Sequence, residues 1–230
     1  MSTSAPVPAH TEVQPGTGLS GATHGLHEVL ADFVKGPELR AALSQMYGVT
    51  PPVLVQPGMR LPVAGQDAQT VDALVDLANG VVWSFRFTSA IGVPYQWAYR
   101  GGSSLRSYVD ANENTASTTF ADLASIGPKI TIPFSGDYDV FFGASPNAGS
   151  TSSTTGFMGV SVGGGAPAVP LLRVLMPGSG NINMSLDTQT RLTGVTAGQT
   201  ITAQYKIAGG GNMDFTERWM TITPIRCAGG

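Results

Sequence analysis

Few side chains of this sequence have both the type and the spacing that catalysis requires. Gly159–Gly163 reads G-V-S-V-G and matches the nucleophile elbow G-x-S-x-G, which needs a strand-to-helix turn and a later acid and histidine. Gly and Pro residues follow the motif, and the three histidines, His10, His24 and His27, all precede it. We therefore interpret the motif as a strand with small residues and expect no serine nucleophile.

Metal ligands and cofactor motifs are equally sparse. The histidines have no cysteine or carboxylate at zinc-ligand spacing. Asp137 and Asp139 flank Tyr138 and so point outward together, where they could form a calcium corner, although we favour a solvated face. Gly163–Gly165 lacks the Lys-Ser/Thr of a phosphate loop. Cys227, beyond the last expected strand, has no activating base nearby and is interpreted as inert. We expect no metal, no cofactor and no enzymatic activity.

The composition indicates a β-rich chain without a charged partner. Only 12% of the 230 residues are charged and the net charge is −3, so neither nucleic acid nor an anionic membrane is an expected partner. No apolar run approaches the roughly 20 residues of a membrane span. The 30 glycines and 16 prolines suit many short strands and turns. The single cysteine excludes an internal disulfide.

The N-terminal region is expected to be an arm. Residues 1–21 are polar and rich in Pro and Gly without the layout of a secretory signal, so a flexible segment is expected. Two short amphipathic helices should follow, because apolar residues recur with helical spacing. Short helices need a surface to lie on, so they either pad the main domain or anchor the chain to a neighbour. The candidate anchoring residues are Leu26, Val29, Phe33, Leu39, Leu43 and Met46.

The rest of the chain shows the period-2 alternation of strands. Residues 71–77, 81–87 and 95–99 predict a three-stranded antiparallel meander. Residues 129–134 and 138–142 alternate on either side of Ser-Gly-Asp and predict a hairpin. Residues 115–123 and several segments up to 225 predict further strands. The candidate aromatics, which we assign to core packing rather than to a sugar or base platform, are Trp83, Phe85, Phe87, Trp97, Tyr99, Tyr138, Tyr205 and Trp219.

These elements predict a mainly β fold: an antiparallel meander plus a jelly-roll β-sandwich, preceded by a short α-helical N-terminal arm. The expected division is a flexible and helical arm at 1–50, a Pro-rich linker at 51–61, the meander at 62–106 and the jelly roll at 107–230.

Two resemblances support this division. Ile130–Phe142 (I-T-I-P-F-S-G-D-Y-D-V-F-F) resembles the strand, Pro, Gly-x-Tyr, strand signature of C1q/TNF-like jelly rolls. Leu192–Ala203 is similar to a later strand of that family, with Gln199 where the family usually has Asp, and Phe215–Ile225 matches its closing aromatic strand. Pro62–Leu105, with P-V-A-G-Q, N-G-V-V-W-S-F-R-F and G-G-S, resembles a repeat of minor tail and fibre proteins of tailed bacteriophages.

The resemblances imply a virion protein with a trimeric β-rich head and offer no catalytic residue to transfer. The expected function is therefore a structural virion component, a minor tail or fibre-like protein on the tail, whose arm binds other virion proteins. Three alternatives stay open: a fibre or decoration protein on the capsid surface, a module that binds a host cell-surface glycan, and a depolymerase. The last would need paired carboxylates in a groove, for which the sequence shows no signature.

Overall fold

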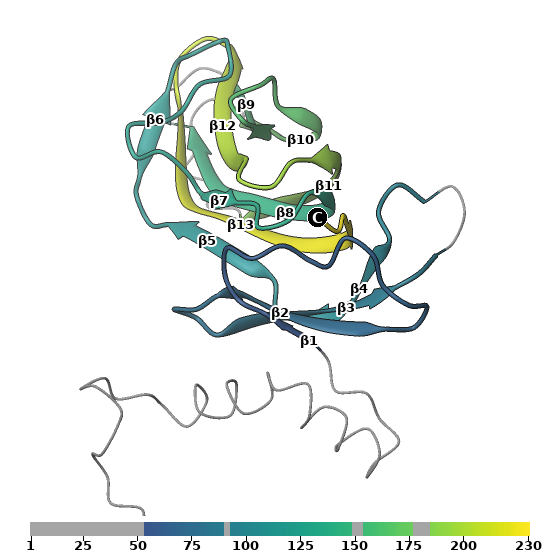
Figure 1. Cartoon of the computed structure of the whole chain (residues 1–230). Helices are drawn as coiled ribbons and strands as arrows, with labels where there is room; N and C mark the ends of the chain where they lie inside the picture. The colour runs from purple at the N-terminus through teal and green to yellow at the C-terminus, as the bar shows by residue number, and fades with distance from the viewer. Residues whose placement is uncertain (1–52, 90–92, 149–153, 177–184) are drawn as a thin grey trace, which may run out of the picture. The chain divides into compact units, whose positions relative to one another are not determined.

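The computed structural model describes residues 53–89, 93–148, 154–176 and 185–230 (Figure 1). The chain divides into two compact units, Met1–Pro51 and Pro52–Gly230. The first unit, with the expected helices and the six candidate anchoring residues, lies outside the described residues. The described part contains strands and no helix, and so it holds no helix able to cross a membrane.

Thirteen strands make up the described part. In chain order they are β1 (Val53–Val55), β2 (Thr70–Asp76), β3 (Val81–Phe87), β4 (Trp97–Gly102), β5 (Leu105–Val109), β6 (Glu113–Thr115), β7 (Lys129–Thr131), β8 (Gly136–Ala148), β9 (Thr154–Val162), β10 (Ala168–Met176), β11 (Leu186–Val195), β12 (Thr200–Gly209) and β13 (Met213–Cys227).

The strands form two sheets (Figure 1). The larger sheet has the order β1-β2-β3-β4-β13-β8-β11, and β5 and β6 pair with earlier stretches of β13. The smaller sheet has the order β10-β9-β12-β7. All pairs are antiparallel except β1 with β2, which is parallel.

The strands from β5 onward have jelly-roll connectivity. With β5 and β6 counted as one interrupted strand, this part has eight strands. In spatial order, the first, eighth, third and sixth (β5/β6, β13, β8 and β11) form one sheet. The second, seventh, fourth and fifth (β7, β12, β9 and β10) form the other. Two Greek keys wound in this way define a jelly roll. The predicted fold class, mainly β with a meander and a jelly roll, is confirmed.

Alternating residues explain why these segments form strands. Tyr138, Val140 and Phe142 of β8 and Ile201, Ala203 and Tyr205 of β12 are fully buried, whereas the residues that alternate with them reach the surface. Burial of one such side chain stabilises the fold by about 1.5–3 kcal/mol. The two inner faces therefore hold the jelly roll together.

The predicted hairpin at residues 129–142 is wrong. β7 pairs with β12 in the smaller sheet, whereas β8 pairs with β13 and β11 in the larger sheet. The Pro133–Ser135 segment is therefore a corner that takes the chain from one sheet to the other. Pro133, which lacks an amide donor, lies beyond the end of β7, and β7 is an edge strand of the smaller sheet.

Three further segments differ from the sequence-based division. Val53–Val55, expected in a linker, forms β1 against β2. Residues 115–123, expected as a strand, contribute only the end of β6 and an isolated bridge from Ala121 to Tyr205. The expected boundary at residue 106 falls inside β5, and the meander and the jelly roll share one sheet because β4 pairs with the end of β13.

A bulge in β13 determines which of its residues enter the core. Thr216 pairs with Ser145 and Trp219 pairs with Gly143, so β13 has one more residue than β8 between these two pairs. The extra residue, Glu217, has a φ of 46°. Such a bulge shifts the alternation by one. Arg218 therefore points inward and is fully buried, whereas Trp219 points outward.

Candidate binding surfaces

Most of the candidate aromatics lie in the core. Tyr99 and Trp219 are half-buried. The other six are buried, namely Trp83, Phe85, Phe87, Trp97, Tyr138 and Tyr205. The indole N–H groups of Trp83 and Trp97 donate to the carbonyls of Ser103 and Pro62, each at 2.8 Å, so both indoles are satisfied inside the protein.

Of the residues considered for catalysis or metal binding, the three histidines lie outside the described residues, and the others have structural roles. Ser161 is buried within β9 and donates to the Gly165 carbonyl, as expected for a strand residue. Asp139 forms an ion pair with Arg191 at 3.0 Å, and Asp137 accepts the Gly194 amide at 3.0 Å. Among the described residues, no group of three His, Cys, Asp or Glu side chains could hold a metal ion.

Cys227 ends β13 and is buried, rather than lying beyond the last strand as expected. Burial raises the pKa of its thiol to about 12, so the thiol is protonated at neutral pH. Its Sγ lies 3.6 Å from the Tyr138 hydroxyl. A protonated, buried thiol is a poor nucleophile, as the sequence-based interpretation of an inert cysteine requires.

Three aromatic residues face outward from the larger sheet, and we call them the aromatic strip: Tyr108 of β5, Trp219 of β13 and Phe141 of β8. Tyr108 lies directly opposite Trp219, and Trp219 lies opposite Gly143, two residues from Phe141. Tyr108 and Phe141 are 48% and 41% exposed. The strip therefore crosses three adjacent strands and presents apolar rings to solvent.

Gly143 explains how Trp219 lies on the sheet. A Cβ at Gly143 would stand 2.9 Å from the indole and 2.4 Å from the Leu186 carbonyl oxygen. Only glycine therefore lets the indole lie over β8. Trp219 is held flat on the outer face rather than projecting freely from it.

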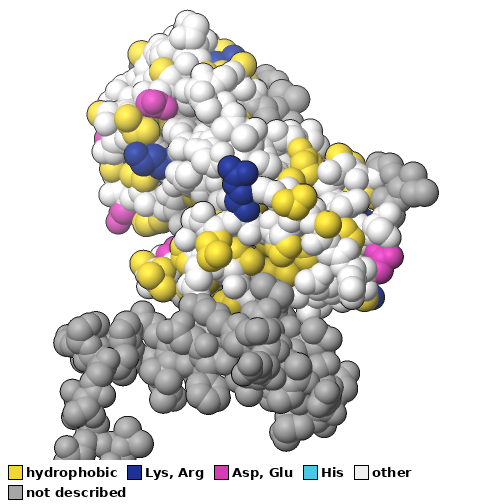
Figure 2. Space-filling model, in the orientation of Figure 1, with side chains coloured by type: hydrophobic (Ala, Val, Ile, Leu, Met, Phe, Trp, Pro, Cys, Tyr) yellow, Lys and Arg dark blue, Asp and Glu magenta, His cyan; other side chains and the backbone are white. Residues whose placement is uncertain are grey.

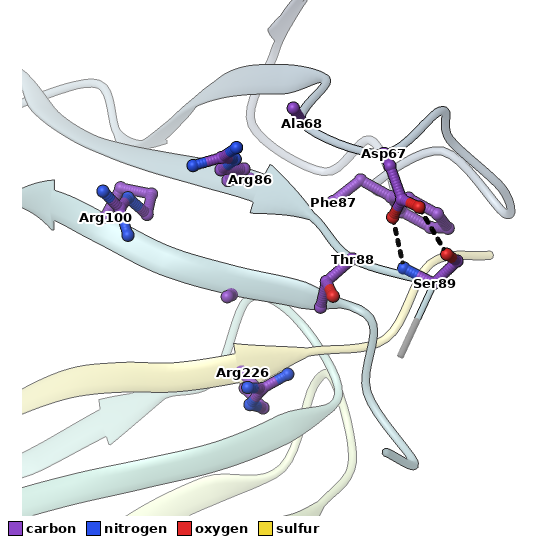
Figure 3. A pocket seen from close by; sticks show the side chains of 9 residues that line it. Asp67, Ala68, Arg86, Phe87, Thr88, Ser89, Arg100 and Arg226 are labelled. Atoms are coloured by element: carbon purple, nitrogen blue, oxygen red, sulfur yellow. Dashed lines mark hydrogen bonds between the residues drawn. The ribbon is translucent and has the colours of Figure 1, made fainter. Parts of the chain in front are cut away.

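Three arginines line an open pocket of about 520 Å³ where the meander strands β3 and β4 meet the end of β13. We call it the arginine pocket. Arg86 comes from β3, Arg100 from β4 and Arg226 from β13 (Figure 3). Asp67 and Ser89 form another wall. The three guanidinium groups thus come from residues up to 140 positions apart in the sequence, and only the sheet brings them together.

The face of the molecule drawn in Figure 2 has few charged side chains. Figure 2 shows a band of hydrophobic side chains over the meander, with acidic and basic side chains scattered around it. The exposed large hydrophobic residues include Met59, Val63 and Leu77 near this part of the chain. Single exposed apolar residues are normal on protein surfaces, so we assign no function to them.

No protein-family model matches the chain, and no curated protein sequence matches it. Among solved structures it is similar to an Eiger TNF from S. frugiperda, at 8% identity over 55% of this chain and 96% of that chain with a TM-score of 0.36. The carbohydrate-binding module TmCBM61, solved with beta-1,4-galactotriose, has 14% identity over 68% and 87%, with a TM-score of 0.28. Infectious bursal disease virus strain Gx has 13% identity over 63% and 41%, with a TM-score of 0.27. At these TM-scores we draw no conclusion from the likenesses.

Proposed function

We propose that this protein is a non-enzymatic structural component of a bacteriophage virion, a minor tail or fibre-like protein whose jelly roll associates as a homotrimer. The observation that supports assembly is the aromatic strip. The virion role and the threefold symmetry rest on the sequence resemblances of Pro62–Leu105 and Ile130–Phe142.

The aromatic strip suits a contact between copies. Its rings lie on neighbouring strands of a rigid sheet, so they can be covered by one flat surface without rearrangement. Thr221 and Gly143, which lie between the rings, add neither charge nor bulk, and the charged Arg106 lies at the edge of the strip, opposite Thr221. Aromatic residues are enriched in the buried centres of interfaces, where charged residues are depleted. Closed symmetry would bury the strip of every copy in the same way.

The absence of enzymatic activity is part of the proposal. Ser161 and Cys227 are buried and engaged in local contacts, and Asp137 and Asp139 each bind a partner on β11. An acid, a base and a nucleophile would have to converge on one cleft for hydrolysis. Purified protein should release no soluble sugar or peptide from host cell walls, and release that is abolished by an Asp or Glu substitution would contradict the proposal.

Light scattering on the full chain at micromolar concentration tests the assembly. We expect the mass of three chains, and Phe141→Glu should shift the mass to one chain because a carboxylate cannot be buried unpaired in the interface. Leu77→Glu is the matched control, since Leu77 is 73% exposed and lies outside the strip. A monomeric wild type, or equal dissociation of both variants, would reject the homotrimer.

The strip also allows the second candidate function, a host glycan platform, because Trp219 lies flat over Gly143 as a stacking ring does. The two functions compete for one surface. A glycan platform predicts a monomer whose tryptophan fluorescence changes when host wall polysaccharide is added.

The location on the virion needs a separate experiment. Antibody labelling of intact virions in the electron microscope distinguishes the tail from the capsid surface.

A further inference from the structure

We propose that the arginine pocket is a binding site for an oxyanion, a carboxylate, phosphate or sulfate carried by a ligand about the size of one sugar unit. The pocket shares no residue with the aromatic strip, so the inference goes beyond the proposed assembly. A volume of about 520 Å³ lies within the range of small-molecule sites.

The first argument is an imbalance of charge. Arg86, Arg100 and Arg226 form no ion pair or hydrogen bond to a side chain within the described part of the chain. The two arginines of the jelly roll that do have such partners are Arg191, bound to Asp139, and Arg218, bound to Glu113. A chain with a net charge of −3 thus gathers three positive charges in one pocket, against the single carboxylate of Asp67 in its wall. Like charges at close range favour the binding of an anion.

The nearby carboxylates offset these charges only in part. Asp67, the only acidic residue of the pocket wall, accepts the Ser89 amide and the Ser89 hydroxyl, each at 2.6 Å (Figure 3). Those hydrogen bonds, with a smaller contribution from the charge of Arg86, lower the pKa of the Asp67 carboxyl, so Asp67 is ionised and offsets one of the three positive charges. Asp137, which lies opposite Arg226 on β8, accepts the Gly194 amide. The pocket therefore remains positive.

The second argument is a buried donor without a partner. Nη1 of Arg226 is buried and has no hydrogen-bond partner among the described residues. Buried polar groups are almost always hydrogen-bonded, and an unsatisfied one is costly. Because Nη1 is shielded from solvent, an oxyanion in the pocket would supply the missing acceptor only after the Arg226 side chain turns toward the pocket.

The third argument is the placement of the arginines on neighbouring strands. Arg86, Ala98 and Arg226 lie directly opposite one another on β3, β4 and β13. The small side chain of Ala98 leaves space between the two arginines. Arginine presents a planar fork that matches carboxylate and phosphate oxygens in two parallel hydrogen bonds. The paired strands fix the backbone positions of the arginines, and the exposed Arg86 and Arg100 side chains become ordered when a ligand binds.

The test follows the arginine Nε–Hε signals of the ¹⁵N-labelled full chain by NMR. Sodium glucuronate, sodium phosphate and sodium sulfate are titrated separately, with the ionic strength held constant by sodium chloride. We expect at least one probe to shift the signals of the pocket arginines until they saturate. Tighter binding of glucuronate identifies a carboxylate ligand, and tighter binding of phosphate or sulfate identifies an ester; both support the site.

Arg100→Gln is the principal variant because its side chain is exposed and its loss does not disturb the core. It should weaken binding about tenfold, the loss expected for one charge-assisted interaction. Arg86→Gln, also exposed, should behave alike and guards against a folding defect in one variant. Arg100→Lys keeps the charge without the fork and should bind less tightly than wild type.

Arg106→Gln is the matched control, because Arg106 is exposed on β5 outside the pocket and its loss changes the net charge equally. It should bind all three probes as wild type does. If no probe saturates, or if Arg106→Gln weakens binding as much as Arg100→Gln, the pocket is not an oxyanion site.

Discussion

Two arginines of the jelly roll form ion pairs in very different surroundings. Arg218 is fully buried; it donates to the carbonyls of Ser125 and Gly127 and to Glu113, and lies over the Tyr205 ring. Arg191 is 62% exposed in its pair with Asp139. Burial determines how much the loss of such a pair destabilises the fold. Water screens the exposed pair, whereas it cannot replace the lost partners of the buried pair.

Arg218→Met should therefore lower the free energy of unfolding by about 3–5 kcal/mol, the cost of breaking a buried pair and orphaning two carbonyls. Arg191→Met should change it by less than about 1 kcal/mol. Urea denaturation of the two variants gives the comparison. Similar losses in both would show that Arg218 contributes no more than a surface charge.

The buried ionisable groups predict a loss of stability in alkali. Burial raises the pKa of Cys227 to about 12, and burial likewise raises those of Tyr138 and Tyr205. In the unfolded chain the thiol and the phenol have pKa values of about 8.5 and about 10. The pKa of each group is higher in the folded state than in the unfolded state. The contribution of these groups to the free energy of unfolding is therefore complete below the unfolded-state pKa values, and it is lost as the pH rises above those values.

Urea unfolding at pH 7, 9, 10 and 11 should show this decline, beginning near the unfolded pKa of the thiol at about 8.5. Cys227→Ala removes the thiol's share, so its stability should fall less steeply between about pH 8.5 and 10. An identical pH dependence in wild type and variant would show that the thiol ionises as readily in the folded chain as in the unfolded one.

At the level of single residues, the sequence could not predict the arginine pocket or the burial of Arg218. Strict alternation places Phe215 and Met220 on opposite faces, yet both are buried because the bulge at Glu217 adds a residue. The pocket depends on the register of three strands. Its only local signal is that Arg86 occupies an outward position of its strand.

At the level of elements, the C-terminal residues tie the meander to the jelly roll. Only Arg226 and Cys227 of β13 pair with β4. The amide of Gly230 donates to the Leu61 carbonyl at 2.9 Å, and Ala228 donates to the Ser135 carbonyl at 2.7 Å. The tail therefore contacts the loop before β2 and the corner between β7 and β8 at once.

Gly229→Ala should loosen this junction, because the new Cβ would stand 2.0 Å from the Pro62 carbonyl oxygen, which also accepts the Trp97 indole. The expected loss is about 1 kcal/mol, the worth of one displaced hydrogen bond. Hydrogen exchange should accelerate in β4 and at residues 61–63 but not in β9 or β12. Gly101→Ala is the control, since its Cβ meets nothing within 4 Å.

Alternation located most strands but not their sheets. The predicted strands at 71–77 and 81–87 correspond closely to β2 and β3, because each has one buried and one exposed face. The same signal in β7 and β8 could not show that the chain changes sheets at Pro133–Ser135. Ser, Gly and Asp interrupt the alternation in a tight hairpin turn and also in a corner between two sheets. Only the pairing of each strand with partners distant in the sequence distinguishes the turn from the corner.

At the level of the whole molecule, residues 53–230 have a core of their own, which makes the arm separable. We expect deletion of residues 1–50 to leave a folded β unit that no longer enters virions. Phe33→Asp combined with Leu43→Asp should have the same effect in the full chain, since each buried apolar anchor is worth about 1.5–3 kcal/mol. The copy number on purified particles is the measurement. Normal incorporation of the truncated protein would leave the helices as padding of the main domain.

The central place of β13 has a consequence for biosynthesis. β13 closes the larger sheet by pairing with β4, β5, β6 and β8, and it follows all of them in the chain. At about 5–20 residues per second, roughly four to sixteen seconds separate the completion of β8 from that of β13. During that interval, nascent chains on one messenger RNA would expose the strand edges of β4 and β8 to one another. Their productive folding therefore depends on keeping those edges apart until the ribosome has delivered residue 227.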